Sequence, residues 1–275
     1  MTMSQIQAIR ERVRRLGARP AHELRILRLW AQAKPQNSGR RPLESFMPTA
    51  LREDLAQLTD DLNGLLRLQS AHPAEDGSVR WLLALQDGQT LETVGLPRDG
   101  LCVSSQVGCA VGCVFCMTGR DGLIRQVGSA EIVAQVAFAR LHRTVKKVVF
   151  MGMGEPAHNL DNVMEAIEVL GTVGNIAHKS LVFSTVGDPR VFERLPRGLV
   201  KPALAVSLHT TRADLRAQLL PRAPKMSPEE LVEAAEVYAR QTGYPIQYQW
   251  TLIEGVNDSE EELEGIVRLL KGKYA

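Results

Sequence analysis

The sequence lacks the features of a membrane or secreted protein. It contains no run of about 18 or more apolar residues, the length needed to cross a bilayer as a helix. Its first residues, MTMSQIQAIRERVRR, have neither the apolar core nor the small-residue cleavage site of a secretion signal. We therefore expect a cytoplasmic protein without membrane contact. Structural disulfides are rare in that reducing compartment, so the cysteines need another explanation.

Cysteine is also scarce, and all four cysteines lie in one short stretch, CVSSQVGCAVGCVFC (102–116). Cys109, Cys113 and Cys116 have the spacing C-x3-C-x2-C on a loop between an expected strand and the next helix. Thiolate ligands select zinc, Cu(I) or iron–sulfur clusters. Structural zinc sites usually take four ligands from two separated pairs, and the sequence has no second pair.

Cys102 is poorly placed to be a fourth ligand. Extended chain between Cys102 and Cys109 could separate them by about 20 Å, although a loop could fold back. Three cysteines on a cluster of four irons would leave one iron open, as catalytic metals keep a position free for substrate. The aromatic Phe115 would shield such a cluster from solvent. The spacing favours an iron–sulfur cluster, while zinc and unrelated buried thiols remain alternatives.

The charge of the chain is unevenly distributed, although its net value is only +2. The first 41 residues contain ten basic and two acidic side chains, so they carry +8 and the remainder carries −6. A basic helical arm on a mildly acidic body is typical of an appendage that binds a polyanion. A solvated Arg-rich helix face would have the same composition, and charge alone does not separate the two.

Hydrophobic periodicity predicts helices over 4–33 and 50–70, followed by a domain boundary near residue 72. A β-hairpin is expected from 79–85 and 90–97, which flank a tight Asp-Gly turn.

From residue 101 onward, apolar strands alternate with helices, which predicts a parallel sheet. Polar segments (GMGEP, STVGD, SLHTT and EGVND) follow the later strands, at the strand ends where α/β folds bind ligands. The expected strands are 101–108, 147–154, 181–185, 203–209 and 246–253, and the expected helices are 129–143, 160–171, 189–195, 212–219, 227–241 and 259–271.

The cysteine loop resembles that of radical S-adenosylmethionine (SAM) enzymes. More narrowly, the chain resembles the RNA adenine methyltransferases that modify large-subunit ribosomal RNA, and in some members transfer RNA, at an adenine carbon. The matching segments are LETVGLP, LCVSSQVGCAVGCVFCMTG, VVFMGMGEPAHNLDNV, FSTVG, ALAVSLHTT and TLIEGVND, within about residues 80–260. The resemblance implies an α/β fold, with a helical RNA-binding accessory domain (1–72), a β-hairpin connector (73–100) and a radical SAM partial (β/α) barrel (101–275).

The resemblance also implies two cofactors. Cys109, Cys113 and Cys116 would bind a [4Fe–4S] cluster, whose free iron chelates the amino and carboxylate groups of SAM. Gly154 and Glu155 would bind the SAM amino group. The rest of the SAM pocket would be lined by Ser184, Ser207, Leu208 and His209.

Two further residues would take part in the reaction of that family. Reductive cleavage of SAM would give a 5′-deoxyadenosyl radical, which takes hydrogen from a methyl group carried on a C-terminal cysteine. Cys102 matches the cysteine that resolves the protein–RNA adduct. Glu92 matches the proton acceptor, with a solvated strand residue as the alternative.

An adenine C2 or C8 is a poor nucleophile, so a radical route is chemically consistent. The target adenine would have to be unstacked or presented in a single-stranded loop. The expected partners are ribosomal or transfer RNA and a one-electron reductant such as flavodoxin or ferredoxin. We expect the protein to be a monomer.

The chain departs from the family toward its C-terminus, where no cysteine follows Cys116. It ends roughly where a sixth strand should begin, so we expect a truncated chain without the methyl-carrying cysteine. In such a chain SAM cleavage can survive, but the two-step methyl transfer should fail. The alternatives are a short paralogue, a non-catalytic iron–sulfur RNA-binding protein, and a radical SAM enzyme with different chemistry.

Overall fold

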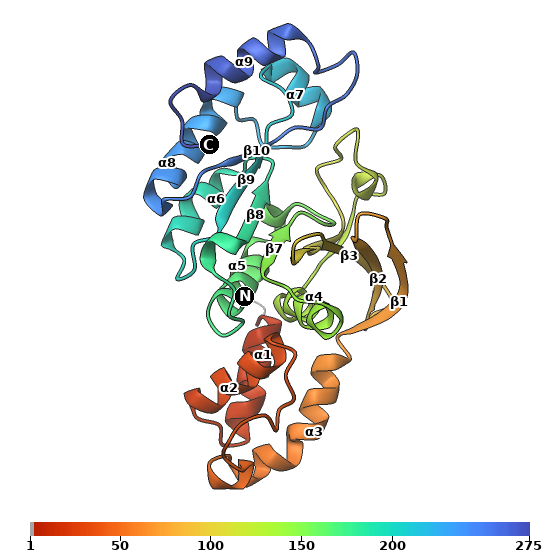
Figure 1. Cartoon of the computed structure of the whole chain (residues 1–275), viewed down its shortest axis with the longest axis vertical. Coiled ribbons are helices and arrows are strands. Elements are labelled where there is room, and N and C mark those ends of the chain that lie inside the picture. Colours follow the sequence, from red (N-terminus) through yellow and green to blue (C-terminus); the bar gives the residue numbers. More distant parts are fainter. Residues whose placement is uncertain (1–2) are drawn as a thin grey trace.

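The computed structural model describes residues 3–275 and has a helical segment at one end of an elongated molecule (Figure 1). This segment comprises α1 (Gln5–Arg15), α2 (Pro20–Ala31) and α3 (Thr49–Asn63). Their apolar faces meet in a core that includes Ile6, Ile26 and Leu58, each no more than 1% exposed. Residues 1 and 2 of the expected accessory domain lie outside the described residues.

One eight-stranded sheet runs through the rest of the molecule. In spatial order its strands are β1 (Leu66–Pro73), β2 (Val79–Leu85), β3 (Thr90–Leu96), β4 (Gly100–Cys102), β7 (Lys147–Phe150), β8 (Leu181–Thr185), β9 (Ala203–Ser207) and β10 (Gln247–Gln249). The first four strands pair antiparallel, and pairing is parallel from β4 through β10. The sheet is open between its edges β1 and β10, so the expected α/β partial barrel is confirmed.

The helix α4 (Ser129–His142) joins the two parts of the molecule. It contacts α1, α2 and α3 on one side and β1 and α5 on others, and ten of its 14 residues are buried. A helix buried on most sides needs apolar residues all round, and α4 has them. The other helices are α5 (Leu160–Gly171), α6 (Pro189–Arg194), α7 (Ala213–Leu219), α8 (Pro228–Thr242) and α9 (Glu260–Leu270).

Short elements complete the fold. The strands β5 (Gln106–Gly108) and β6 (Leu123–Gln126) form a separate antiparallel pair that flanks the cysteine loop. Single 3₁₀ turns occur at Leu43–Ser45, Met117–Gly119, Pro156–Asn159, His178–Ser180 and Leu195–Arg197. Within residues 3–275, no helix combines the length and apolarity that a membrane span requires.

Two expected elements change type or divide in the structure. The helix expected over 50–70 ends at Asn63 with Gly64 as its cap, because residues 66–73 instead pair with β2 and form β1. The sequence pattern does not indicate this helix end, because the leucines beyond Gly64 continue the helical spacing.

The strand expected over 101–108 divides into β4 and β5. Ser105 and Gln106 leave the ladder and donate their N–H groups to the Met153 carbonyl, at 2.9 and 3.1 Å. This detour ties the approach to the cysteine loop to the loop that follows β7. The division of the chain at residues 72 and 100 stays a prediction, and β1 pairs with β2 across the first of these points.

Candidate functional site

A cavity of about 220 Å³ lies at the carboxyl ends of β7, β8 and β9. Parallel strands present the loops that follow them at one edge of the sheet, so residues far apart in sequence can meet there. Eight of the eleven predicted site residues line this cavity: Cys109, Cys113, Cys116, Gly154, Glu155, Ser184, Ser207 and His209.

The cysteine loop forms one wall of the cavity. Gly108 enters the loop at φ +76°, and a Cβ at this position would lie 2.0 Å from the carbonyl oxygen of Gly122, so only glycine fits. The N–H of Cys109 donates to that same carbonyl at 2.9 Å. The N–H of Cys116 donates to the Cys113 carbonyl at 3.0 Å. The loop folded in this way places all three thiols on one wall.

The three thiols differ in environment. Cys109 is buried, Cys113 is half-buried and Cys116 is exposed. Burial raises the pKa of Cys109, and it raises the pKa of Cys113 to about 12, with neighbouring thiols adding to both effects. These two thiols are therefore protonated at neutral pH, and a metal centre would have to displace their protons.

The donor set fits a cluster held by three thiolates. Among residues 3–275, no three cysteine, histidine or carboxylate side chains already converge on a point where a metal ion could bind. The three cysteines instead line one cavity, where they supply the three thiolates that such a cluster would take. Phe115 covers this space, with its ring edge-on to His209 at a centroid distance of 4.8 Å.

Glu155 presents a buried carboxyl group to the cavity. It is 5% exposed, its own N–H donates to Gln106 Oε1 at 2.7 Å, and its carboxylate accepts the N–H groups of Ala157 and Val186, both at 3.2 Å. Burial raises the pKa of Glu155 to about 7, although hydrogen bonds to its carboxylate from Thr185, Ala157 and Val186 act in the opposite direction. No side chain of the described residues forms an ion pair with it, so it suits a ligand that brings its own positive charge.

Gly154 allows this arrangement because it has no side chain. Its φ is +100°, and a Cβ there would lie 2.4 Å from the Cβ of Gln106. Any other residue would push the loop after β7 away from the start of the cysteine loop.

Gln249 joins the ends of three strands. Its Oε1 accepts from Ser184 Oγ at 3.1 Å and from Ser207 Oγ at 3.4 Å, and its Nε2 donates to Met151 Sδ at 3.1 Å. Gln249 also lines the cavity, yet the sequence did not identify it. Gln247 and Gln249 share a face by alternation, so no local signal distinguishes them.

His209 is held as a neutral imidazole. Its φ of +62° is unusual for a residue other than glycine, and its Nδ1 accepts the N–H of Thr251 at 2.9 Å. A ring nitrogen that accepts a hydrogen bond carries no proton, which places the proton on Nε2. Burial lowers the pKa of His209 to about 4, and the charge of Arg216 acts in the same direction. His209 therefore offers the cavity a hydrogen-bond donor without a charge.

Leu208 and Cys102 are not brought into the cavity wall. Leu208 is 1% exposed in the core, and its N–H donates to the Gln249 carbonyl at 3.1 Å. Cys102 packs in an apolar cluster with Met151 and Val149, and burial raises its pKa to about 11. Because Met151 also lines the cavity, Cys102 lies one side chain away from it. The structure thus separates Cys102 from the other three cysteines.

Glu92 also lies outside the cavity wall. Its carboxylate pairs with Arg80 Nη1 at 2.5 Å, and its side chain is 37% exposed. Its backbone reaches toward the site, since its N–H contacts Met153 Sδ at 3.3 Å and its carbonyl accepts from Ser104 Oγ at 2.5 Å.

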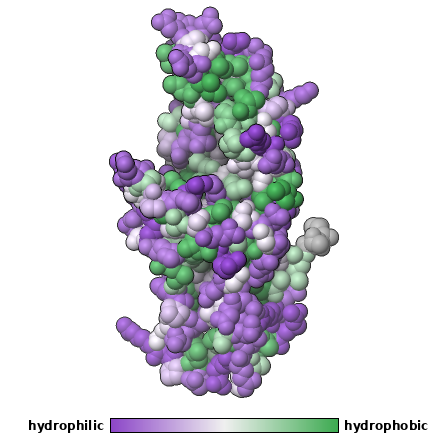
Figure 2. All heavy atoms as spheres, turned by 90° about the vertical axis from the view of Figure 1, so that its right-hand side faces the viewer, coloured by the Kyte–Doolittle hydropathy of each residue, from purple (hydrophilic) through white to green (hydrophobic). Residues whose placement is uncertain are grey.

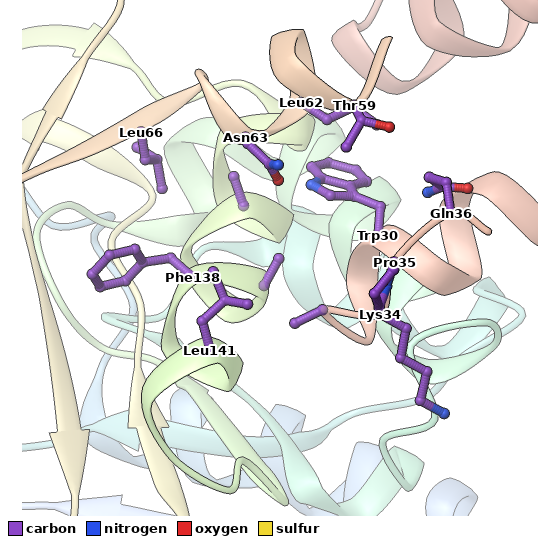
Figure 3. Close-up of a pocket in the computed structure, with 13 residues that line it drawn as sticks. Trp30, Lys34, Pro35, Gln36, Thr59, Leu62, Asn63, Leu66, Phe138 and Leu141 are labelled. Carbon is purple, nitrogen blue, oxygen red and sulfur yellow. The ribbon is translucent and has the colours of Figure 1, made fainter. Parts of the chain in front are cut away.

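A second cavity, of about 460 Å³, lies between α2, α3 and α4 (Figure 3). Trp30, Leu62 and Phe138 give it mainly apolar walls. None of the predicted site residues lines it. This cavity marks the junction between the N-terminal helices and α4, away from the cysteine loop.

Comparisons with known proteins agree with this geometry. The family model for the Radical SAM superfamily matches residues 103–270. Proteins from Leptothrix cholodnii and Azoarcus sp., each named as a probable RNA methyltransferase, are 72% and 71% identical over 270 residues. Each match covers 98% of this chain and 78% of the relative.

A solved structure gives the same result for the fold. The crystal structure of a radical SAM methyltransferase from Sphaerobacter thermophilus is 34% identical, with a TM-score of 0.81. The match covers 99% of this chain and 83% of that chain. Sequence and fold therefore agree that this chain belongs to the radical SAM superfamily, within its family of RNA methyltransferases.

Proposed function

We propose that this protein acts on an adenine carbon, C2 or C8, of ribosomal or transfer RNA, using SAM and a [4Fe–4S] cluster. The observation that carries this proposal is the single cavity shared by Cys109, Cys113 and Cys116 with the residues that follow β7, β8 and β9. When bound, the reduced cluster and SAM supply the radical reactivity that an adenine carbon requires.

The protein's own residues would bind and orient these groups. The three cysteines would hold the cluster, and the buried carboxylate of Glu155 would accept the amino group of SAM, which supplies its missing cation. Ser184, Ser207 and the Nε2–H of His209 would donate or accept hydrogen bonds around the rest of SAM. Leu208 would contact SAM through its backbone.

Cys102 and Glu92 would serve the RNA step and not the cofactors. Both lie outside the cavity wall, and Cys102 has the apolar surroundings of a thiol that stays protonated until a partner arrives. Glu92, half-exposed and paired with Arg80, would accept a proton once RNA displaces that pair.

The N-terminal helices would bind the RNA. Some of their basic side chains are occupied within the protein, since Arg12 pairs with Asp54 and Asp61, and Arg14 pairs with Glu23. Hydrophilic residues predominate at this end of the face shown in Figure 2. The basic side chains that remain exposed without an ion pair among the described residues are Arg15, Arg19, Arg28, Lys34, Arg40 and Arg41.

Charge removal in this segment tests its role. Replacing Arg40 and Arg41 by alanine should weaken RNA binding and reduce the salt slope of log K by roughly 1 for each lost phosphate contact. Lys271→Ala, at the other end of the chain, is the matched control. If the double variant kept its RNA affinity and salt slope, the loop that carries Arg40 and Arg41 would not be part of the surface that binds RNA.

The cluster is tested by anaerobic reconstitution. We expect iron and sulfide incorporation, absorption in the visible range, and 5′-deoxyadenosine on addition of a reductant and SAM. Cys113→Ala should abolish iron binding, whereas Cys102→Ala should retain it. Zinc in place of iron, or loss of iron in both variants, would overturn the assignment.

Methyl transfer is tested separately, by mass spectrometry of RNA incubated with the reconstituted protein, SAM and a reductant. Methyladenosine would support the proposed reaction, and its absence where 5′-deoxyadenosine still forms would contradict the methyl-transfer step for these 275 residues.

A further inference from the structure

A single arginine is buried beside the cysteine cavity. Arg216, on α7, is 4% exposed. Its Nη2 donates to the carbonyl oxygens of Val186, at 2.5 Å, and Ser207, at 3.0 Å. Its Nε is buried without a hydrogen-bond partner, and no carboxylate of residues 3–275 forms an ion pair with it. The guanidinium thus joins the chain after β8 to the end of β9 while its charge stays unpaired.

Such a cation is expensive for the folded protein. Burying a charge without an opposite partner strongly destabilises the folded state, and hydrogen bonds to two carbonyl oxygens offset only part of this loss. Neutral donors could also bridge Val186 and Ser207, so bridging alone does not explain a permanent charge. The structure therefore needs a source of negative charge close to Arg216.

The position of Arg216 identifies the source. Val186 and Ser207, whose carbonyl oxygens accept from Arg216, both line the cavity together with the three cysteines. Leu215 and Leu219, on the same helix as Arg216, belong to the apolar cluster of Cys109. Burial lowers the pKa of Arg216, and Arg216 in turn helps to lower the pKa of His209, another residue that lines the cavity. Arg216 is therefore within electrostatic reach of the proposed cluster ligands.

A second cation that contacts the loop is placed differently. Arg222 lies against Gly112, where an added Cβ would be 3.1 Å from its Nη2, but Arg222 is exposed to solvent. Water screens an exposed charge far more than a buried one. Arg216 is thus the cation whose field reaches the cavity with little screening.

We propose that Arg216 is the fixed counter-charge of a cluster bound by Cys109, Cys113 and Cys116, and that it makes one-electron reduction of that cluster easier. This inference rests on the proposed cluster. Each thiolate brings a negative charge, and the electron from the reductant adds another. A nearby buried cation stabilises the reduced state more than the oxidised one, which raises the reduction potential.

Arg216 acts on the cluster through its field and not by ligation, so it is a positioning residue. Arginine suits this role because its planar group can bridge two carbonyls and cannot lose its charge in a buried site.

Two variants separate the charge from the bridge. Arg216→Lys and Arg216→Gln both keep N–H donors on a shorter side chain, but only lysine keeps the positive charge. Loss of packing or of the bridge should affect both variants alike. The control is Arg140→Gln, since Arg140 is a half-buried arginine that also donates to two carbonyls, those of Ala31 and Gly174, away from the cavity.

The measurement is a redox titration of the reconstituted proteins, followed by electron paramagnetic resonance. In Arg216→Gln we expect the reduced-to-oxidised ratio at a given solution potential to fall at least tenfold, a shift of 59 mV for one electron. Arg216→Lys should retain most of the wild-type potential. Arg140→Gln should lose stability in thermal unfolding but leave the potential unchanged.

The outcomes distinguish this inference from the proposed function. Equal potentials in Arg216→Gln and Arg216→Lys, or a wild-type potential in both, would overturn the counter-charge while leaving the cluster in place. Failure of the wild-type protein to take up iron would overturn the proposed function and the counter-charge with it.

Discussion

Two buried glutamates show that the N-terminal helices and the cavity differ in how a buried negative charge is balanced. Glu23, in α2, is 2% exposed, and both its carboxylate oxygens accept from Arg14, at 2.7 and 2.8 Å, with Arg10 at 3.7 Å. Glu155 is almost as buried, yet no side chain of the described residues forms an ion pair with it. The N-terminal helices therefore satisfy their own buried charge, whereas the cavity leaves an anion for a ligand to neutralise. One region is arranged for stability, and the other gives up stability for binding.

The largest effect is expected where the cavity needs a close approach of two backbones. Gly154→Ala should destabilise the protein by about 2–5 kcal/mol, because it adds left-handed strain and a Cβ clash with Gln106. Gly88→Ala is the control, since its φ is +84° and nothing lies within 4 Å of its added Cβ. It should lose only about 1–2 kcal/mol. Urea unfolding measures the free energy of unfolding of both variants. Equal decreases would mean that the contact with Gln106 does not contribute to the effect of Gly154→Ala.

The next effect concerns pH. The folded-state pKa of Glu155 is about 7, above its ordinary value of 4.5. Its contribution to stability is therefore fully present below pH 4.5 and is lost as the pH rises through 7. At 1.36 kcal/mol per pKa unit, Glu155→Gln in the ligand-free protein should gain about 3 kcal/mol over the wild type between pH 4 and pH 8.

Urea unfolding at a series of pH values measures this gain, and the same variant should lose SAM binding. A difference between wild type and variant that does not change with pH would show that Glu155 is already neutralised by the protein.

A smaller effect of opposite sign is expected at the other glutamate. Glu23→Gln should destabilise the protein by about 2 kcal/mol at neutral pH, because it removes the partner of Arg14 and Arg10. Asp61→Asn is the control, since the Asp61 side chain is half-exposed and Arg12 keeps its pair with Asp54. Its unfolding midpoint should hardly move. If Glu23→Gln stabilised the protein instead, the inferred difference between the N-terminal helices and the cavity would be wrong.

The sequence predicted the elements whose patterns are strong and sharply bounded. The helix 160–171 and the strand 181–185 occur with the expected bounds, because an amphipathic run and a short apolar run each end at turn residues. The strands expected at 147, 203 and 246 end earlier, since the polar residues that follow them belong to the loops of the cavity. Eight site residues could be found because they stand in motifs at or just after strand ends, three cysteines after β5 and five residues at the ends of β7, β8 and β9.

Residues without a local pattern could not be found in this way. Arg216 follows Leu215 in a short amphipathic helix, where an arginine usually faces water. Gln249 is one of two glutamines in a short strand. Their roles depend on which strand ends meet in the folded protein, and that information is not carried by neighbours in the sequence.

The strand β10 sets a limit on how rigid the site can be. It is an edge strand in which only Gln247–Gln249 pair with β9. The Gln249 carbonyl nevertheless accepts the N–H groups of both Leu208 and His209, and its side chain holds two serines. Local opening of these three residues therefore releases the cavity as a unit, at a free energy below that of global unfolding. Hydrogen exchange at Leu208 and His209 should slow when any ligand fills the cavity, even one that touches neither amide.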